Sequence, residues 1–203
     1  AFTKGLDIHA ATAARLFGVA PEHVDKNQRR IAKMVVFGVI YGISAFGLSQ
    51  RLNIPKKEAA NIIDNYFREF STIKSYMDGS IESARKNGYV ETILGRRRYL
   101  RDINSANAVV RGFAERNAIN APIQGSAADL IKVAMINIHR ELNQRNLKSR
   151  MILQVHDELV FDVSNDELDL IKPIIRECMV NAISMTVPLE VEIGTGKNWL
   201  EAH

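Results

Sequence analysis

The stretch MILQVHDELVFDV, residues 151–163, contains two apolar runs rich in β-branched side chains. The runs meet at two polar residues, His156 and Asp157. Two such runs on either side of a short polar turn predict an antiparallel β-hairpin. This hairpin decides the fold class, because most of the remaining chain has helical patterns.

Helical patterns extend from the hairpin in both directions. The long stretch before it, from about Ser105 to Gln144, predicts a helix that bends at Pro122. A helix from Asp166 to about Ser184 and a last strand over 189–193 are predicted after it. Residues 105–203 are therefore expected to form an α+β part.

Residues 1–104 are expected to form a mainly helical part, since side chains that suit helix starts recur along it. They predict one helix that is capped by Asp7 and ends at Phe17, a second that is capped by Ser44, and a third that has Pro55 in its first turn. A fourth helix is predicted from a Ser71 cap to Asn87. A small hairpin with a basic tip is predicted to follow it over 89–100. The whole chain is thus predicted to be α+β, with a boundary near residue 104.

The composition excludes several classes of protein. With 203 residues, 46% of them apolar, the chain can bury a core and is not a disordered tail. A charged fraction of 25%, and no apolar run of about 18–20 residues, exclude a membrane protein. The single cysteine, Cys178, cannot form an internal disulfide, which favours a reducing, cytoplasmic location. Because the chain begins at Ala1 without an initiator Met, a larger precursor is expected.

The net charge changes sign along the chain. Residues 1–116 carry a net charge of +8, and residues 117–203 carry −4. This distribution suits a protein that holds a polyanion with its first part and a metal ion with its second. Solvated helix faces of uneven sign would give the same counts.

The segment RRIAKMVVFGVIYG, residues 29–42, has four functional side chains at intervals of four. Arg29, Lys33, Phe37 and Tyr41 would share a helix face about 120° wide. The two cations suit a polyphosphate and the two rings suit a sugar or a base, so the face predicts a site for a nucleoside triphosphate. An amphipathic helix with its rings in the core is the alternative.

The pattern Arg29-x3-Lys33-x7-Tyr41-Gly42 resembles the fingers-helix motif of family A DNA polymerases. The resemblance implies that Arg29 and Lys33 contact the triphosphate of the incoming nucleotide. It also implies that Phe37 packs on the sugar and base of that nucleotide, and that Tyr41 packs near the template base. Gly42 makes Tyr41-Gly42 a predicted break in the helix.

Two further segments resemble the same family. DIHAATA, residues 7–13, is similar to the family segment whose histidine reaches the triphosphate, which nominates His9; an idle surface histidine is the alternative. GRRRYL, residues 95–100, resembles another shared stretch, and its dense positive charge suits phosphates. A solvated charge run would look the same.

Arg116, Asn120 and Gln124 also follow one another at intervals of four. Their guanidinium and amide donors suit the acceptors of the DNA minor groove, where they could test base-pair shape without reading sequence. The resemblance implies that they contact the minor groove of primer-template DNA near the growing end. Without it, capping and packing around Pro122 would account for Asn120.

Adjacent carboxylates stand at the turn of the predicted hairpin. Asp157 and Glu158 are costly there unless a cation satisfies them, and Mg²⁺ is the cation that phosphoryl transfer uses. The residues His156-Asp157-Glu158 resemble the palm motif of the family. The resemblance implies that Asp157 binds the catalytic metals, that Glu158 supports it, and that His156 lies near the primer terminus. An acidic surface turn is the alternative.

The family's second metal-binding aspartate lies in a motif of the form Asp-Tyr-Ser-x-x-Glu-x-Arg, which this sequence lacks. We therefore expect residues 1–104 to form the fingers and residues 105–203 the C-terminal part of the palm, without the thumb, in a chain that alone shows little or no polymerisation. For the complete enzyme, the resemblance implies template-directed transfer from dNTPs to a primer 3′-OH with two Mg²⁺ ions. Lys33 could then donate a proton to the leaving pyrophosphate.

The implied partners are primer-template DNA, dNTPs, and the upstream palm, thumb and any exonuclease domains, with no membrane. Two other functions stay open. A non-catalytic binder of nucleic acid or nucleotides would keep the basic helices and lack the chemistry; an aspartate motif upstream of Ala1 would argue against it. A metal-dependent nuclease using Asp157 and Glu158 is weakened because the sequence has no further clustered carboxylates.

Overall fold

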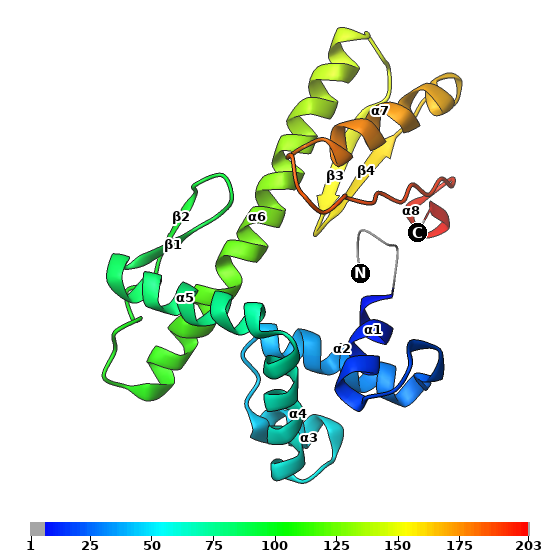
Figure 1. Ribbon diagram of the computed structural model, residues 1–203. Helices are drawn as coiled ribbons and strands as arrows, with labels where there is room; N and C mark the ends of the chain where they lie inside the picture. Colours follow the sequence, from blue (N-terminus) through cyan, green and yellow to red (C-terminus); the bar gives the residue numbers. More distant parts are fainter. Residues whose placement is uncertain (1–6, 203) are drawn as a thin grey trace. The chain divides into compact units, whose positions relative to one another are not determined.

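The computed structural model describes residues 7–202. The chain divides into two compact units, residues 1–123 and 124–203. The described elements of the first unit are α1 (Ile8–Phe17), the 3-10 helix η2 (Pro21–His23), α2 (Lys26–Ile40), α3 (Ala45–Leu52), α4 (Lys56–Glu69), α5 (Ser71–Asn87), β1 (Tyr89–Glu91), β2 (Arg97–Tyr99) and the first part of α6 (Ala108–Gln144), all in Figure 1. Those of the second unit are the rest of α6, β3 (Arg150–Val155), β4 (Glu158–Asp162), the 3-10 helix η3 (Asn165–Glu167), α7 (Leu168–Val180) and α8 (Trp199–Ala202).

Helices with two antiparallel hairpins confirm the α+β fold class. The division between the compact units falls inside α6, after Ile123. The helix is continuous through Pro122, and the bend predicted there stays a prediction. The boundary near residue 104, which was drawn from a change of sequence pattern, stays a prediction about subdomains.

The helix starts of the first unit follow from their capping side chains. The Asp7 carboxylate accepts the backbone N–H groups of His9 and Ala10, and the Ser44 hydroxyl accepts that of Gly47. Both predicted caps are therefore confirmed. Asp25 and Gln28 form a capping box at the start of α2, so the helix that carries the predicted nucleotide-binding residues is fixed at its first turn.

Two predicted helix starts are wrong by one residue. Pro55 is the N-cap of α4 and not a first-turn residue, because its backbone is extended (φ −57°, ψ 142°). Ser71 is the first residue of α5, and Phe70 is its N-cap. Phe70 is also the C-cap of α4, so a single residue separates the two helices.

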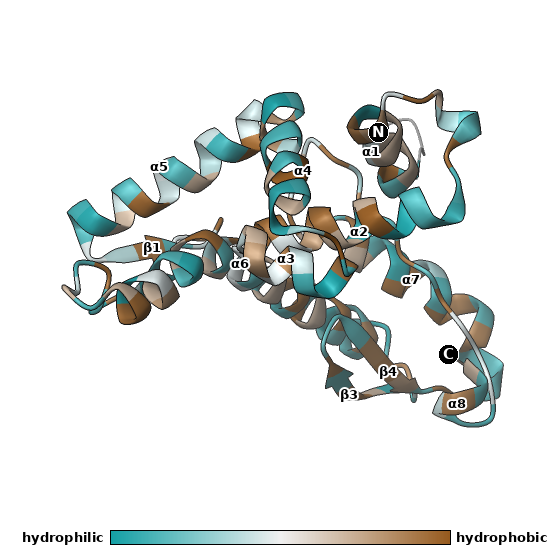
Figure 2. Cartoon of the chain, turned by 90° about the horizontal axis from the view of Figure 1, so that it is seen from below, coloured by the Kyte–Doolittle hydropathy of each residue, from teal (hydrophilic) through white to brown (hydrophobic). Residues whose placement is uncertain are grey.

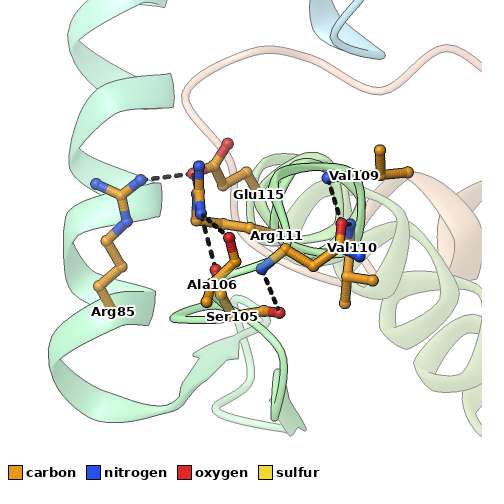
Figure 3. A network of polar contacts seen from close by, with 8 residues as sticks. Arg85, Ser105, Ala106, Val109, Val110, Arg111 and Glu115 are labelled. Atoms are coloured by element: carbon orange, nitrogen blue, oxygen red, sulfur yellow. Dashed lines mark hydrogen bonds and ion pairs between the residues drawn. The ribbon is translucent and has the colours of Figure 1, made fainter.

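A polar network fixes the start of α6, which begins at Ala108 and not near Ser105 (Figure 3). The Asn107 side chain caps the helix by accepting the N–H of Val109 at 2.9 Å. Arg111 reaches back and donates to the carbonyl oxygen of Ser105 at 2.8 Å. Glu115 pairs with both Arg111 and Arg85 of α5 (Figure 3). The first turns of α6 are thereby tied to the preceding loop and to α5.

The main core of the first unit lies among α2, α3 and α4. Val35, Leu48 and Tyr66 are almost completely buried in it. The Tyr66 ring lies 5.0 Å from the ring of Phe70, measured between centroids. Figure 2 shows that α2 changes from hydrophilic residues at its start to hydrophobic residues at its end. Val35 and Val39 of α2 are buried whereas Arg29 and Lys33 are exposed, so one face of the helix serves the core and another stays exposed.

The predicted hairpin of the second unit is confirmed. β3 and β4 pair antiparallel, with Val155 opposite Glu158, and a bulge interrupts the register between Met151 and Leu153. Residues of α6, α7 and β4 share one core around Ile138 and Ile171, and α7 lies alongside the hairpin in Figure 1. This core holds the hairpin and leaves its turn outside.

A buried carboxylate ties η3 to the start of β3. Glu167 accepts the N–H of Lys148 at 2.8 Å, the N–H of Ser149 at 2.8 Å, and the hydroxyl of Ser149 at 2.6 Å. The backbone hydrogen bond from Lys148, followed by the Ser149 hydroxyl, holds the pKa of Glu167 below its usual value of 4.5. The carboxylate therefore stays ionised in spite of its burial.

One prediction for the C-terminal region is confirmed with shorter bounds and one is wrong. The helix predicted from Asp166 to about Ser184 is present as α7, which follows η3, begins at Leu168 and ends at Val180. The strand predicted over 189–193 is absent, since β3 and β4 pair only with each other among residues 7–202. The carbonyl oxygen of Val191 accepts the Arg176 guanidinium at 2.7 Å and takes no part in a β-ladder.

Between residues 7 and 202, no helix is both long and apolar enough to span a membrane.

Candidate functional site

An exposed face of α2 carries three of the predicted nucleotide-binding side chains. Arg29 and Lys33 are exposed, and 47% of Phe37 is accessible to solvent. Val35 and Val39 of the same helix lie in the core of the first unit. The alternative reading, in which the Phe37 ring belongs to the core, is therefore wrong.

Tyr41 lies just beyond the end of α2, so the predicted row of four does not fall entirely within one helix. The helix ends at Ile40, and Gly42 takes up a left-handed backbone conformation (φ +72°). The predicted break at Tyr41-Gly42 is thus confirmed. The Tyr41 N–H still donates to the Phe37 carbonyl oxygen at 3.0 Å, and 51% of the residue is exposed.

The start of α1 lies against this face of α2. The rings of His9 and Phe37 are 5.6 Å apart between centroids. The Arg29 Nε donates to the Asp7 Oδ2 at 2.7 Å. His9, Arg29 and Phe37 are therefore brought together within the first unit, and Lys33 lies on the same helix between the last two.

Sequence reasoning missed Asp7 as a member of this group. Its position before a helix indicated a cap, and no local pattern indicates its contact with Arg29, which lies 22 residues further along the chain. The hydrogen bond from Arg29, followed by the backbone N–H of Ala10, holds the pKa of Asp7 below its usual value. Asp7 is therefore an anion at neutral pH, and it lies directly beside one of the predicted phosphate-binding cations.

Arg116 packs over the turn that follows α2. A Cβ atom built on Gly42 would lie 2.7 Å from the Arg116 Cγ and 2.9 Å from its Cδ, so the Arg116 side chain would have to leave this conformation if position 42 were not glycine. The Arg116 guanidinium lies 5.9 Å from the centre of the Phe113 ring. Tyr41-Gly42 and Arg116, which the sequence suggested in two separate motifs, are thus neighbours in the first unit.

The predicted DNA-binding row lies on α6. Arg116 and Gln124 are exposed, and Asn120 is half-buried. The three residues follow one another at intervals of four within a continuous helix, as predicted.

The basic stretch at 95–100 forms the turn and second strand of the β1–β2 hairpin. Arg97 stacks on the Tyr89 ring at 4.5 Å and pairs with Glu91 at 2.8 Å. The exposed Arg98 lies opposite Val90 in the ladder. Part of the positive charge is therefore neutralised within the hairpin itself.

The acidic turn joins β3 and β4. His156 and Asp157 form the two-residue loop and are exposed, whereas Glu158 begins β4 and is half-buried. His156 has a positive φ of 52°, as primed hairpin turns require at their first central residue. Gln154 braces the loop by donating its side-chain amide to the His156 carbonyl oxygen at 2.6 Å. In the described part of the chain, no three His, Cys, Asp or Glu side chains gather into a group that could hold a metal ion.

Comparisons with known proteins agree on one family. The family model described as DNA polymerase family A matches residues 1–201. The chain is 54% identical over 202 residues to DNA polymerase I of Chloroflexus aurantiacus and 53% identical over 203 residues to that of Lactococcus lactis. It covers 99% and 100% of its own length in these matches, but only 21% and 23% of the two relatives.

A solved structure gives the same result. The structure described as the POL domain of Pol1 from M. smegmatis in complex with DNA primer-template and dNTP superposes with a TM-score of 0.94 at 47% sequence identity. The match covers 99% of this chain and 35% of that one. With a family model that matches nearly every residue and relatives more than 50% identical, this chain belongs to DNA polymerase family A.

Proposed function

We propose that this chain provides the fingers and the C-terminal part of the palm of a DNA polymerase that carries out template-directed synthesis. The observation that carries the proposal is the grouping of the exposed Arg29 and Phe37 with the half-buried His9 in a family A chain. The solved relative was bound to primer-template DNA and dNTP, which supports the same two partners here. A cytoplasmic location accords with the lone Cys178.

The first unit would bind the incoming nucleotide. Arg29 and Lys33 supply positive charge, and His9 supplies a further donor, for the triphosphate. The half-exposed ring of Phe37 is available to pack on the sugar and base. Lys33 has the further role of donating a proton to the leaving pyrophosphate, which makes it the catalytic residue of this unit.

Tyr41, Arg116, Asn120 and Gln124 would contact the DNA. Tyr41 is exposed at the end of α2 and offers a ring to the template base. Arg116, Asn120 and Gln124 offer donors to the acceptors of the minor groove, which are present in every base pair. These contacts would therefore report the shape of a base pair whatever its sequence. His156, at the exposed hairpin loop, would lie near the primer terminus.

Asp157 and Glu158 would hold Mg²⁺. Adjacent carboxylates at a turn fit this ion, because Mg²⁺ is commonly bound by one or two carboxylates together with substrate phosphates and water. When bound, Mg²⁺ neutralises phosphate charge and activates the attacking hydroxyl. Asp157 is the main ligand because it is exposed in the loop, and Glu158, at the first position of β4, supports it.

The test is primer extension with a chimaera in which residues 1–203 replace the matching segment of Lactococcus lactis DNA polymerase I, which they match at full length. We expect the chimaera to extend a primer with Mg²⁺ and four dNTPs, and the isolated chain to show little or no extension. Asp157→Asn should nearly abolish extension. Asp162→Asn is the matched control, because Asp162 is an exposed aspartate at the far end of the same hairpin.

A chimaera that binds primer-template DNA without extending it would favour the non-catalytic binder. Degradation of the primer that depends on Asp157 would favour the nuclease. Retention of full activity by Asp157→Asn would remove this residue from the metal site.

A further inference from the structure

One carboxylate, that of Asp7, connects the two helices that carry the proposed triphosphate-binding residues. Its Oδ1 accepts the backbone N–H of His9 at 2.9 Å and that of Ala10 at 3.1 Å. Its Oδ2 accepts the Arg29 Nε at 2.7 Å. Both oxygens are thus in use: one fixes the start of α1 at His9, and the other holds a cation of α2.

The contact engages only one edge of the Arg29 guanidinium. The bond to Asp7 is made through Nε, and the two Nη atoms have no protein partner among residues 7–202. A guanidinium held by Nε keeps its orientation and still has Nη donors for an anion. The contact therefore orients Arg29 without consuming its capacity to bind phosphate.

A long, exposed arginine side chain samples many rotamers, so a fixed partner reduces the conformational entropy that the side chain loses when it binds a ligand. About half of the Arg29 side chain is exposed, and the core does not hold it. The neighbouring His9 is held differently, by its ring contact with Phe37. Asp7 is therefore the described contact that fixes the direction of the Arg29 guanidinium.

We propose that Asp7 is a positioning residue of the triphosphate site, which acts by orienting Arg29 for the phosphates of the incoming nucleotide. The inference rests on the proposed function, since it needs Arg29 to bind phosphate. An anion beside Arg29 could have either of two opposite effects on the binding of phosphate. A carboxylate that mainly repels phosphate would weaken binding, whereas one that orients Arg29 strengthens it.

The experiment is equilibrium titration of the 203-residue chain with inorganic tripolyphosphate and with dATP, followed by calorimetry or NMR. Asp7→Ala should raise the Kd of both ligands about fivefold, the effect of losing one charge-assisted hydrogen bond at an exposed site. Asp7→Asn should raise it less, because asparagine still caps α1 and still offers an oxygen to Nε.

A double-mutant comparison separates positioning from helix capping. In an Arg29→Ala background, Asp7→Ala should have almost no further effect on the Kd, since the residue through which it acts is gone. Asp25→Ala is the matched control, because Asp25 also caps a helix of this site but its described side-chain contacts are with backbone N–H groups alone. It should leave the Kd nearly unchanged.

Three results would overturn the inference. Tighter binding by Asp7→Asn would show that the carboxylate competes with phosphate. An undiminished effect of Asp7→Ala in the Arg29→Ala background, or an equal effect of Asp25→Ala, would show that only the stability of the helix matters. If the unsubstituted chain binds neither ligand, the nucleotide site itself is refuted, and the positioning role with it.

Discussion

Replacement of Gly42 by alanine tests whether the turn after α2 is built around Arg116. The substitution should lower the free energy of unfolding through two separate effects. The first is the left-handed backbone at φ +72°, which costs a non-glycine residue about 1–2 kcal/mol. The second is the collision of the new Cβ with the Arg116 Cγ, at 2.7 Å. Because the exposed arginine can move to another rotamer, this adds only about 0.5–1.5 kcal/mol.

Gly18→Ala is the matched control for the backbone cost. Gly18 has a similar φ of +66°, and no atom lies within 4 Å of a Cβ built there. The free energy of unfolding, measured by urea denaturation, should therefore fall by about 1–2 kcal/mol for Gly18→Ala. The fall for Gly42→Ala should be larger by the cost of moving Arg116.

An Arg116→Ala background isolates that second cost. There the two glycine substitutions should have equal effects, because only the Arg116 Cβ, 3.9 Å away and in ordinary contact, remains near position 42. Equal effects of Gly42→Ala and Gly18→Ala in the unsubstituted chain would refute the packing of Arg116 on this turn. A difference between Gly42→Ala and Gly18→Ala that persisted in the Arg116→Ala background would refute it as well.

Four further predictions concern the core, pH and the nucleotide. Leu48→Ala should lower the free energy of unfolding by about 2–5 kcal/mol in urea denaturation, since the side chain is fully buried; a loss below 1 kcal/mol would contradict its place in the core. Because its folded pKa is lowered, Glu167 stabilises the protein above its unfolded pKa of 4.5, and this contribution is lost as pH falls through the folded value. The stability difference between the unsubstituted chain and Glu167→Gln should therefore shrink on acidification, and a constant difference would speak against it. In the chimaera, Lys33→Ala should weaken the use of dNTPs, measured by extension kinetics, far more than the binding of DNA, measured by titration; equal losses of the two would count against its role. Phe37→Tyr should raise the incorporation of dideoxynucleotides in the same kinetic assay, and unchanged selectivity would count against the role of Phe37.

Local signals predicted the elements well where a single side chain decides the outcome. Asp7 and Ser44 cap their helices by bonds to N–H groups two or three residues away, so the sequence contains both partners. The hairpin turn at His156-Asp157 follows from two apolar runs on either side of two polar residues. The strand predicted over 189–193 failed because a strand also needs a partner strand, which the local pattern does not reveal.

The candidate site was predicted only where local spacing along one helix determines it. The intervals of four placed Arg29, Lys33 and Phe37 together on α2 and the predicted DNA-binding row on α6, although Tyr41 lies just beyond the end of α2. The contacts between rows were not predictable, because Arg29 meets Asp7 and Gly42 meets Arg116 across 22 and 74 residues of chain. Such pairs depend on how the helices pack, which no local pattern encodes.

The positive φ of His156 has an evolutionary consequence. A positive φ costs any residue with a Cβ atom some conformational energy, and glycine would hold the loop at lower cost. Selection for stability alone would therefore replace this residue. Under the proposed function, selection for contact with the primer terminus would retain it, and position 156 would be a point of trade-off between the folding of the hairpin and its use.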